Sequence, residues 1–251
     1  VFIFIFLFCL INFTVNKTKS LFRFININTF FYYIFIPCIL LVSTYSISFH
    51  YDAGFYHLNH QNWLRESNMI LGMVNIFWAY GMSSIYEYIS AILWFDNSFV
   101  FLDFLNLIFV HFFLLLIWDN LLSKRFKVFQ FVAFGILIVS LLDNFGLQGG
   151  RNGYIYLDGI TKQDVSVGIL FFFISIAIFS MLNEEKINDL DSVFLSLITL
   201  FVVQIKISSI FIFYIYIFLF LTLLLRRKIT FKKIVNLHLP FSFFASMWLL
   251  K

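Results

Sequence analysis

The stretch Ile210-Phe-Ile-Phe-Tyr-Ile-Tyr-Ile-Phe-Leu-Phe-Leu-Thr-Leu-Leu-Leu225 decides the fold class of this chain. Only helices and closed barrels satisfy all of their backbone hydrogen bonds inside a lipid bilayer. The strands of a barrel alternate between apolar and polar residues, because one face meets lipid and the other faces the interior. This stretch does not alternate, so it predicts a membrane-spanning helix rather than a barrel strand.

The composition of the whole chain agrees with that prediction. Of its 251 residues, 62% are hydrophobic and 12% are charged, whereas a soluble domain has about 25% charged residues. The mean hydropathy of +0.95 leaves no room for a soluble domain of ordinary size. The sequence therefore predicts an all-α fold, a multi-span transmembrane helical bundle that forms a single transmembrane domain over residues 1–251.

Apolar runs that reach or approach the length needed to cross a bilayer predict the individual spans. They lie near residues 1–13 (a partial span), 30–48, 100–118, 128–142, 165–182, 192–205, 207–225 and 234–250. The chain begins at Val1 inside one apolar run and stops at Lys251 after another, so we expect a fragment that is truncated at both ends. Cys9 and Cys38 both lie in apolar runs and imply no disulfide framework.

The basic residues predict on which side of the membrane each connection lies. If the predicted spans simply alternate, twelve Lys and Arg residues fall on one side and four on the other. The positive-inside rule assigns the richer side to the cytoplasm. The four basic residues on the opposite side are Arg65, Arg151, Lys162 and Lys206.

This topology holds only if residues 83–95 do not cross the membrane. The segment is apolar but thirteen residues long, which is too short for a span. We expect an interfacial helix there, within the first external loop. The non-cytoplasmic side then carries two polar segments, the external loops 49–99 and 143–164, and these are where chemistry is expected.

The first loop concentrates polar residues directly after a span. Asp52 either caps a helix running through Phe55 to Glu66 or serves in a reaction at the membrane surface. His57 and His60 are three residues apart, so on a helix they share a face. With His50 and Asp52 they could hold a divalent metal, or they could bond to headgroups and backbone instead.

The second loop and the residues after it hold further charged groups. Residues 143–164 contain five of the ten glycines, and a glycine-rich backbone allows a ligand to approach closely. Arg151 and Lys162 could bind a phosphate there, although a flexible loop without a ligand explains the same pattern. Lys206 lies between two apolar runs, where a cation either meets a partner or extends to the interface.

The order of these features resembles the GT-C superfamily of multi-span glycosyltransferases. The likeness is to a largely uncharacterised bacterial branch whose first loop reads Asp-Thr-Gly-Leu-Tyr-His followed by a Trp. The matching positions are Asp52-Ala-Gly-Phe-Tyr-His57, Trp63, Gly72, Asn75, Gly81-Met-Ser-Ser84, Lys162-Gln-Asp164 and Ile205-Lys-Ile-Ser-Ser209. The resemblance covers about residues 30–225. It departs at Trp78-Ala-Tyr80 and in lacking a proline before Asp164.

The resemblance implies a multi-pass protein of the bacterial inner membrane that builds cell-envelope polysaccharide. It would transfer a sugar from a polyprenyl-phosphate donor on the non-cytoplasmic side, in contact with membrane lipids and not with nucleic acid. Asp52 would be the catalytic base for the acceptor hydroxyl, and cations would stabilise the leaving phosphate. The residues implied to bind substrate are His57, Arg151, Lys162, Asp164 and Lys206. The resemblance implies no specific cofactor, and a divalent metal at His57 and His60 stays an open alternative.

Two other functions fit the same sequence. A transporter or flippase of lipid-linked glycans would use the loops as a binding cavity without making bonds. A non-catalytic subunit of a membrane complex fits less well, because the intramembrane ionisable residues are few and lack the spacing of a proton relay. For an enzyme, we expect Asp52, Asp164 and Lys206 to converge on one cavity at the external membrane surface.

The topology predicts that cysteines introduced at Asn152 and at Ser123 react with impermeant reagents from opposite sides of the membrane. The measurement is labelling of intact and permeabilised cells in a background without Cys9 and Cys38. Labelling of both positions from the same side would contradict the alternation of spans and, with it, the external placement of Asp52.

Overall fold

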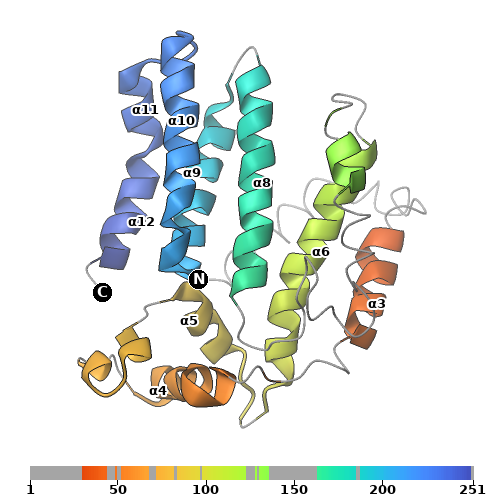
Figure 1. Cartoon of the computed structure of the whole chain (residues 1–251), viewed down its shortest axis with the longest axis vertical. Coiled ribbons are helices and arrows are strands. Elements are labelled where there is room, and N and C mark those ends of the chain that lie inside the picture. Colours follow the sequence, from red (N-terminus) through yellow and green to blue (C-terminus); the bar gives the residue numbers. More distant parts are fainter. Residues whose placement is uncertain are drawn as a thin grey trace, which may run out of the picture.

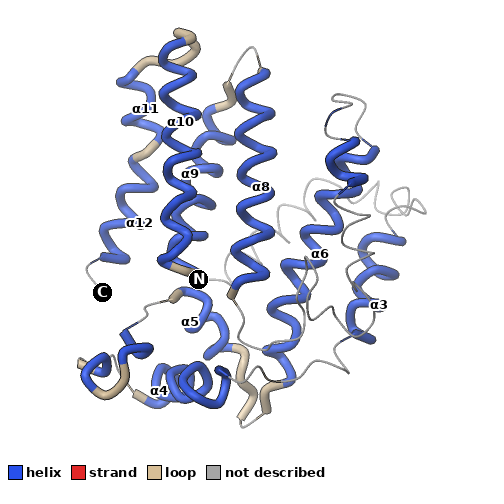
Figure 2. The backbone as a smooth tube through the Cα atoms, viewed as in Figure 1, coloured by secondary structure: helices blue, strands red, loops and turns tan. Residues whose placement is uncertain are grey.

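The structure is a computed structural model, and it describes residues 30–43, 49, 52–67, 72–81, 84–96, 98–122, 128, 130–135, 163–184 and 187–249. Every regular element in these residues is a helix, and Phe95 and Ser98 form an isolated β-bridge (Figure 2). The all-α prediction is confirmed. The predicted span 1–13, most of the span 128–142 and the loop residues 143–162 lie outside the described part of the chain.

The longest helices form a bundle (Figure 1). They are α6 (Val100–Leu122), α8 (Asp164–Asn183), α9 (Asp189–Ile205) and α10 (Ile212–Leu225). A short 3-10 turn, Ile207–Phe211, leads directly into α10. Helix α8 packs against α6, α9 and α10 and thus lies at the centre of the bundle.

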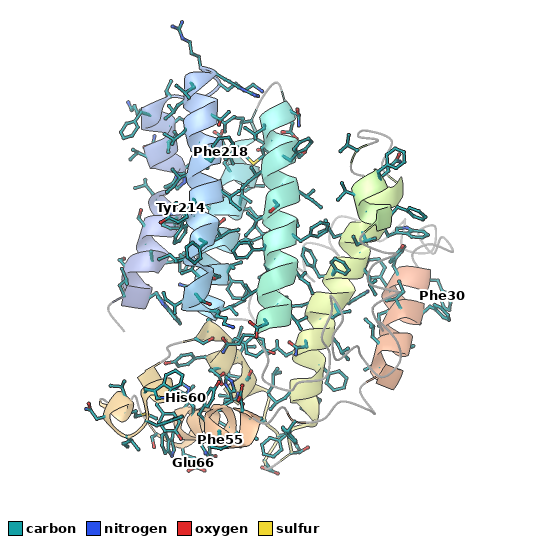
Figure 3. All side chains as sticks on the ribbon, in the orientation of Figure 1. Phe30, Phe55, His60, Glu66, Tyr214 and Phe218 are labelled. Atoms are coloured by element: carbon teal, nitrogen blue, oxygen red, sulfur yellow. The ribbon has the colours of Figure 1, made fainter. Side chains whose placement is uncertain are left out.

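Two helical stretches, Asp164–Asn183 and Ile207–Leu225, are long and apolar enough to cross a membrane. They coincide with two of the predicted spans, 165–182 and 207–225. Helix α10 shows how such a stretch divides its surface: Leu219 and Leu223 are fully buried against other helices, whereas Tyr214 and Phe218 point outward (Figure 3). Residues four apart share a helix face, so the buried pair and the exposed pair define two opposite faces.

The N-terminal helix packs on α6. Helix α3 (Ile36–Ser43) continues a π-helical turn, Phe31–Phe35, within the predicted span 30–48. The His111 Nε2 atom on α6 donates to the Tyr32 carbonyl oxygen at 2.9 Å, and Tyr32 and Trp118 bring their ring centroids to 5.1 Å. Leu40, at the other end of α3, meets Leu107 in the same buried cluster. The two helices therefore run antiparallel, as the alternation of spans requires.

The described residues between α3 and α6 form short helices across one end of the bundle (Figure 1). A π-helical turn, Ala53–His57, leads into α4 (Leu58–Glu66), and 3-10 turns at Met73–Asn75 and Trp78–Gly81 precede α5 (Ile85–Ile92). Helix α5 has eight residues, so it rises only about 12 Å. This length is well below that of a spanning helix, in agreement with the expectation for residues 83–95.

The predicted span 234–250 is wrong as a single helix. The structure has two helices there, α11 (Phe231–Leu237) and α12 (Leu239–Leu249), which meet at His238. Pro240 explains the break, because proline has no N–H and its ring clashes with the carbonyl of the fourth residue before it in a continuous helix. Pro240 instead lies in the first turn of α12, where a backbone N–H would have no partner within the helix.

Ser84 ties the short helices to the bundle. Its hydroxyl accepts from the backbone N–H of Tyr86 at 3.2 Å, capping α5, and donates to the carbonyl of Ile205 at the end of α9 at 2.5 Å. Loss of an N-cap costs about 1 kcal/mol, and the buried Ile205 carbonyl would also lose a donor.

We therefore expect Ser84→Ala to lower the midpoint of thermal unfolding in detergent. Ser67→Ala is the matched control, because Ser67 is exposed at the end of α4 and its backbone N–H, not its side chain, makes the bond there. Equal midpoints for the two variants would show that the Ser84 contact does not hold α5 to α9.

Candidate functional site

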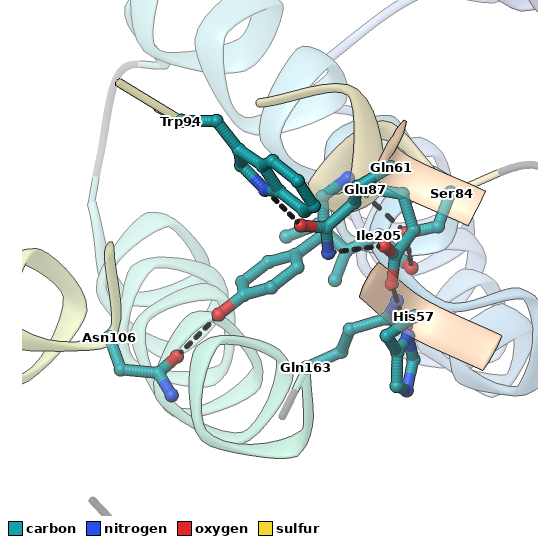
Figure 4. Close-up of polar contacts among 9 residues, drawn as sticks. His57, Gln61, Ser84, Glu87, Trp94, Asn106, Gln163 and Ile205 are labelled. Carbon is teal, nitrogen blue, oxygen red and sulfur yellow. Dashed lines mark hydrogen bonds and ion pairs between the residues drawn. The ribbon is translucent and has the colours of Figure 1, made fainter. Parts of the chain in front are cut away.

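A buried carboxylate lies where α4, α5 and α8 meet. The side chain of Glu87 on α5 is 2% exposed. Its oxygen Oε1 accepts from His57 Nδ1 at 2.5 Å and from Gln163 Nε2 at 3.1 Å, and Oε2 accepts from Gln61 Nε2 at 2.7 Å (Figure 4). The partners come from the continuous helical segment of the π-helical turn and α4 and from the residue before α8, so the carboxylate joins both segments to α5. We call His57, Gln61, Glu87 and Gln163 the polar cluster.

The three donors explain how a charge can lie in so apolar a molecule. A buried carboxylate without partners is strongly disfavoured, whereas one that accepts several hydrogen bonds can stay ionised. Gln61 is fully buried, and its own carbonyl oxygen accepts from Trp94 Nε1 at 2.8 Å. Because a tryptophan N–H can only donate, this bond fixes the amide orientation that turns the Gln61 NH₂ group toward Glu87.

The residue beside Glu87 anchors the cluster to the long helices. The Tyr86 hydroxyl donates to Asn106 Oδ1 on α6 at 2.8 Å, and both side chains are buried. Burial, and secondly the charge of Glu87, raise the pKa of the Tyr86 phenol well above its ordinary value. Tyr86 therefore remains a protonated donor at all physiological pH values and adds no second negative charge.

His57 is the chemically versatile member of the cluster. A carboxylate only accepts hydrogen bonds, so Nδ1 carries the proton that is donated to Glu87 and the lone pair of a neutral ring lies on Nε2. The structure gives Nε2 no partner among the described residues, and the His57 side chain is 10% exposed. The ring packs against Tyr56 with centroids 4.1 Å apart. An imidazole held in one tautomer by an acid can accept or donate a proton on its other nitrogen.

An ion pair lies next to the polar cluster. Lys206 Nζ bonds to Asp164 Oδ1, and the two side chains are 38% and 61% exposed. Asp164 directly follows Gln163, and Lys206 directly follows Ile205, whose carbonyl accepts from Ser84. Because an exposed pair of this kind contributes little to stability, Lys206 can exchange Asp164 for another anion at small cost.

The structure brings together several of the residues that the sequence selected. Asp164 and Lys206 form the ion pair, and His57 reaches the same region through Glu87 and Gln163. Asp52 lies directly before the π-helical turn that ends at His57, and its side chain is partly buried. Arg151 and Lys162 lie outside the described residues.

The interpretation of Asp52 as a helix cap is wrong. Its backbone already has helical angles, φ −67° and ψ −23°, and its side chain makes no capping hydrogen bond. A capping residue needs an extended backbone so that its side chain can turn back to the first N–H groups. The carboxylate of Asp52 is therefore not committed to that role.

The metal alternative finds no support in the described part of the chain. No group of three or more His, Cys, Asp or Glu side chains there could hold a metal ion. His57 gives Nδ1 to Glu87, and His60 is buried with its ring centroid 6.2 Å from that of Tyr80. His50, the third imidazole of the predicted set, lies outside the described residues.

The sequence reasoning missed Glu87, Gln61 and Gln163. A signal for Glu87 was present, because it is the only charged residue in the apolar segment 83–95. An ionisable side chain in apolar surroundings usually marks a functional position. Gln61 and Gln163 gave no such signal, because they carry no charge. Gln163 also lies 76 residues from Glu87 in the chain.

One family relationship covers the whole chain. The model of a domain of unknown function (DUF8201) matches residues 1–251, so the chain belongs to that family. No curated protein and no solved structure matches the chain. Since the family description gives no activity, the function has to be inferred from the site itself.

The polar cluster makes a prediction about stability. Glu87→Gln keeps the shape of the side chain but places an NH₂ group where a donor already points, so one hydrogen bond is lost. The remaining hydrogen bonds are then made to a neutral amide instead of a charged carboxylate. Hydrogen bonds to charged groups contribute about 1.5–3 kcal/mol, and we expect a loss of about 2 kcal/mol in the free energy of unfolding. Denaturant titration in detergent measures it.

The control for this variant is Glu66→Gln, which removes a carboxylate from the exposed end of α4 (Figure 3). We expect the unfolding free energy of this control to stay within about 0.5 kcal/mol of the unmodified protein, as is usual for surface substitutions. A Glu87→Gln variant that is as stable as the control would mean that the cluster is not formed as described.

Proposed function

We propose that this member of the DUF8201 family is a multi-pass membrane glycosyltransferase that uses a polyprenyl-phosphate sugar donor on the non-cytoplasmic side. One observation carries the proposal. The polar cluster and the Lys206–Asp164 pair lie together at one end of α8 and α10, the helices whose length and composition suit a membrane. A reaction on a lipid-linked substrate needs acid–base groups and a cation at that depth.

Lys206 binds the donor phosphate in this proposal. It directly precedes the apolar stretch Ile207–Leu225, so its amine lies at the level where an apolar helix ends and a lipid headgroup begins. The partly exposed amine exchanges Asp164 for the phosphate. When the bond between sugar and phosphate breaks, the same amine stabilises the charge that develops on the leaving phosphate.

Asp52 takes the proton. The acceptor hydroxyl attacks the anomeric carbon, its proton passes to the Asp52 carboxylate, and the polyprenyl phosphate leaves with the electrons of the broken bond. His57, one turn along the same segment, positions a substrate hydroxyl through Nε2, because Glu87 holds its ring. Direct displacement of this kind inverts the configuration of the sugar.

The proposal predicts different effects for two substitutions. Asp52→Asn should lower turnover about 10²- to 10⁴-fold, the usual contribution of a general base, while donor binding is retained. Lys206→Met should lower turnover and, unlike Asp52→Asn, should also weaken binding of the lipid donor. The measurements are release of polyprenyl phosphate from a panel of polyprenyl-phosphate sugars in proteoliposomes and binding of the same lipids.

Glu66→Gln serves as the control and should keep full turnover. If Asp52→Asn keeps turnover within about two-fold, Asp52 is not the base. If the unmodified protein releases no polyprenyl phosphate but moves lipid-linked glycans between leaflets, the protein is a transporter and the enzymatic proposal fails.

A further inference from the structure

An apolar cavity lies at a distance from the polar cluster, between α10, α11 and α12. Its volume is about 430 Å³, and its walls include Phe213, Phe220, Leu224, Phe231 and Phe241. This volume lies in the range of small-molecule binding sites. The cavity opens on the outer surface, because Ile217 and Leu221 in its wall are about half exposed.

The polar atoms in the cavity wall are satisfied by one another. The Tyr216 hydroxyl donates to His238 Nε2 at 2.6 Å, and His238 Nδ1 donates to the Ile234 carbonyl at 2.7 Å. These bonds leave no polar group of the pair in need of a partner. A cavity of this character stays dry and accepts hydrocarbon.

Basic residues follow one another in the turn where α10 passes into α11, next to one end of the cavity. Leu224 and Phe231 line the cavity there, and the turn between them carries Arg226, Arg227 and Lys228. Arg226 and Lys228 donate to the Leu182 carbonyl at the end of α8.

The next two basic residues lie on α11. Lys233 pairs with Asp189 at 2.5 Å. Arg227 and Lys232 are both exposed, and the structure records no hydrogen bond or ion pair for either side chain within the described residues. Arg227 lies in the turn between the cavity-lining residues Leu224 and Phe231, and Lys232 directly follows Phe231. Two cations without a partner among the described residues therefore lie near this end of the apolar cavity.

The backbone at Arg227 gives a second, independent observation. Arg227 has φ +56°, in the left-handed region. The Arg227 N–H donates to the Leu224 carbonyl and the Lys228 N–H to the Leu223 carbonyl, each at 2.9 Å. This is the Schellman motif at a helix C-terminus, in which the left-handed position is usually a glycine. Residues that carry a side chain are disfavoured in this conformation, whereas glycine is not. An arginine here therefore costs some stability in the turn relative to glycine.

We propose that this region binds an anionic glycerophospholipid. One acyl chain fills the cavity between α10, α11 and α12, and the lipid phosphate lies between Arg227 and Lys232. A hydrocarbon chain matches the apolar wall, and an anionic headgroup matches the two cations that have no partner among the described residues. Basic pockets between membrane helices on the cytoplasmic side bind phospholipid headgroups in this way.

The site is separate from the proposed catalytic site. The α10–α11 turn lies at the opposite end of the bundle from α4 and α5 (Figure 1). The charge distribution of the sequence places this turn on the cytoplasmic side, and the lipid would therefore come from the cytoplasmic leaflet. The inference does not depend on glycosyl transfer, because a transporter or a structural subunit would carry the same site.

Native mass spectrometry of the full chain tests the proposal. The protein is released from nanodiscs that contain equal amounts of phosphatidylglycerol and phosphatidylcholine with identical acyl chains. Each basic side chain at an anionic lipid contributes about a five-fold preference, so we expect the unmodified protein to retain phosphatidylglycerol about 25-fold over phosphatidylcholine. The double variant Arg227→Gly/Lys232→Gln should lose nearly all of this preference.

Arg227→Gly also protects the test against misfolding. Glycine suits the left-handed position, so the unfolding midpoint should stay the same or rise while the lipid preference falls. Leu221→Trp fills the cavity and should release both lipids although every cation remains. Arg65→Gln removes a cation from α4, at the other end of the bundle, and should leave the preference unchanged.

Three results would overturn the proposal. Equal retention of both lipids by the unmodified protein would show that the charges select no headgroup. Full retention by Leu221→Trp would mean that the lipid binds by surface charge alone. Displacement of phosphatidylglycerol by added polyprenyl monophosphate would assign the site to a donor-type lipid instead.

Discussion

Most of the architecture at one end of this protein depends on the need to surround one buried carboxylate with donors. Glu87 lies on a helix of eight residues, which is too short to be stable alone. Its oxygens accept from His57, Gln61 and Gln163, and these bonds fix the position of α5 relative to α4 and α8. Since a buried carboxylate that loses a partner is strongly destabilised, these segments hold one another in place. The same bonds determine the tautomer of His57.

The two ends of the bundle carry different groups of charged side chains, and the functional inferences follow from this difference. The acids Glu87 and Asp164 lie at the end where α8 begins, with Lys206 as the balancing cation. The basic turn between α10 and α11 lies at the other end, where two cations have no protein partner in the described part of the chain. The positive-inside rule, applied to the predicted spans, predicts that the basic turn lies in the cytoplasm and the polar cluster outside.

The sequence was sufficient for the helices and insufficient for their polar contacts. The helix of residues 164–183 and the helical stretch of residues 207–225 follow from unbroken apolar runs, because length and hydropathy are properties of consecutive residues. The break at His238 was equally readable from Pro240, since the effect of proline is local. The capping alternative for Asp52 could not be decided from the sequence, because side-chain capping depends on backbone angles that the sequence does not show. The charge of Glu87 within an apolar segment was readable from the sequence, but its hydrogen bond with Gln163 was not, because only the tertiary fold brings the two residues together.

A double-mutant cycle between Glu87→Gln and Gln163→Leu tests most directly whether this carboxylate holds α5 to α8. The free energy of unfolding in detergent is measured for the unmodified protein, both single variants and the double variant. Residues that share a hydrogen-bond network show coupling energies of about 0.5–3 kcal/mol, whereas separate sites are additive within about 0.3–0.5 kcal/mol. A coupling energy above about 1 kcal/mol is predicted here, and additive effects of the two substitutions would contradict the account.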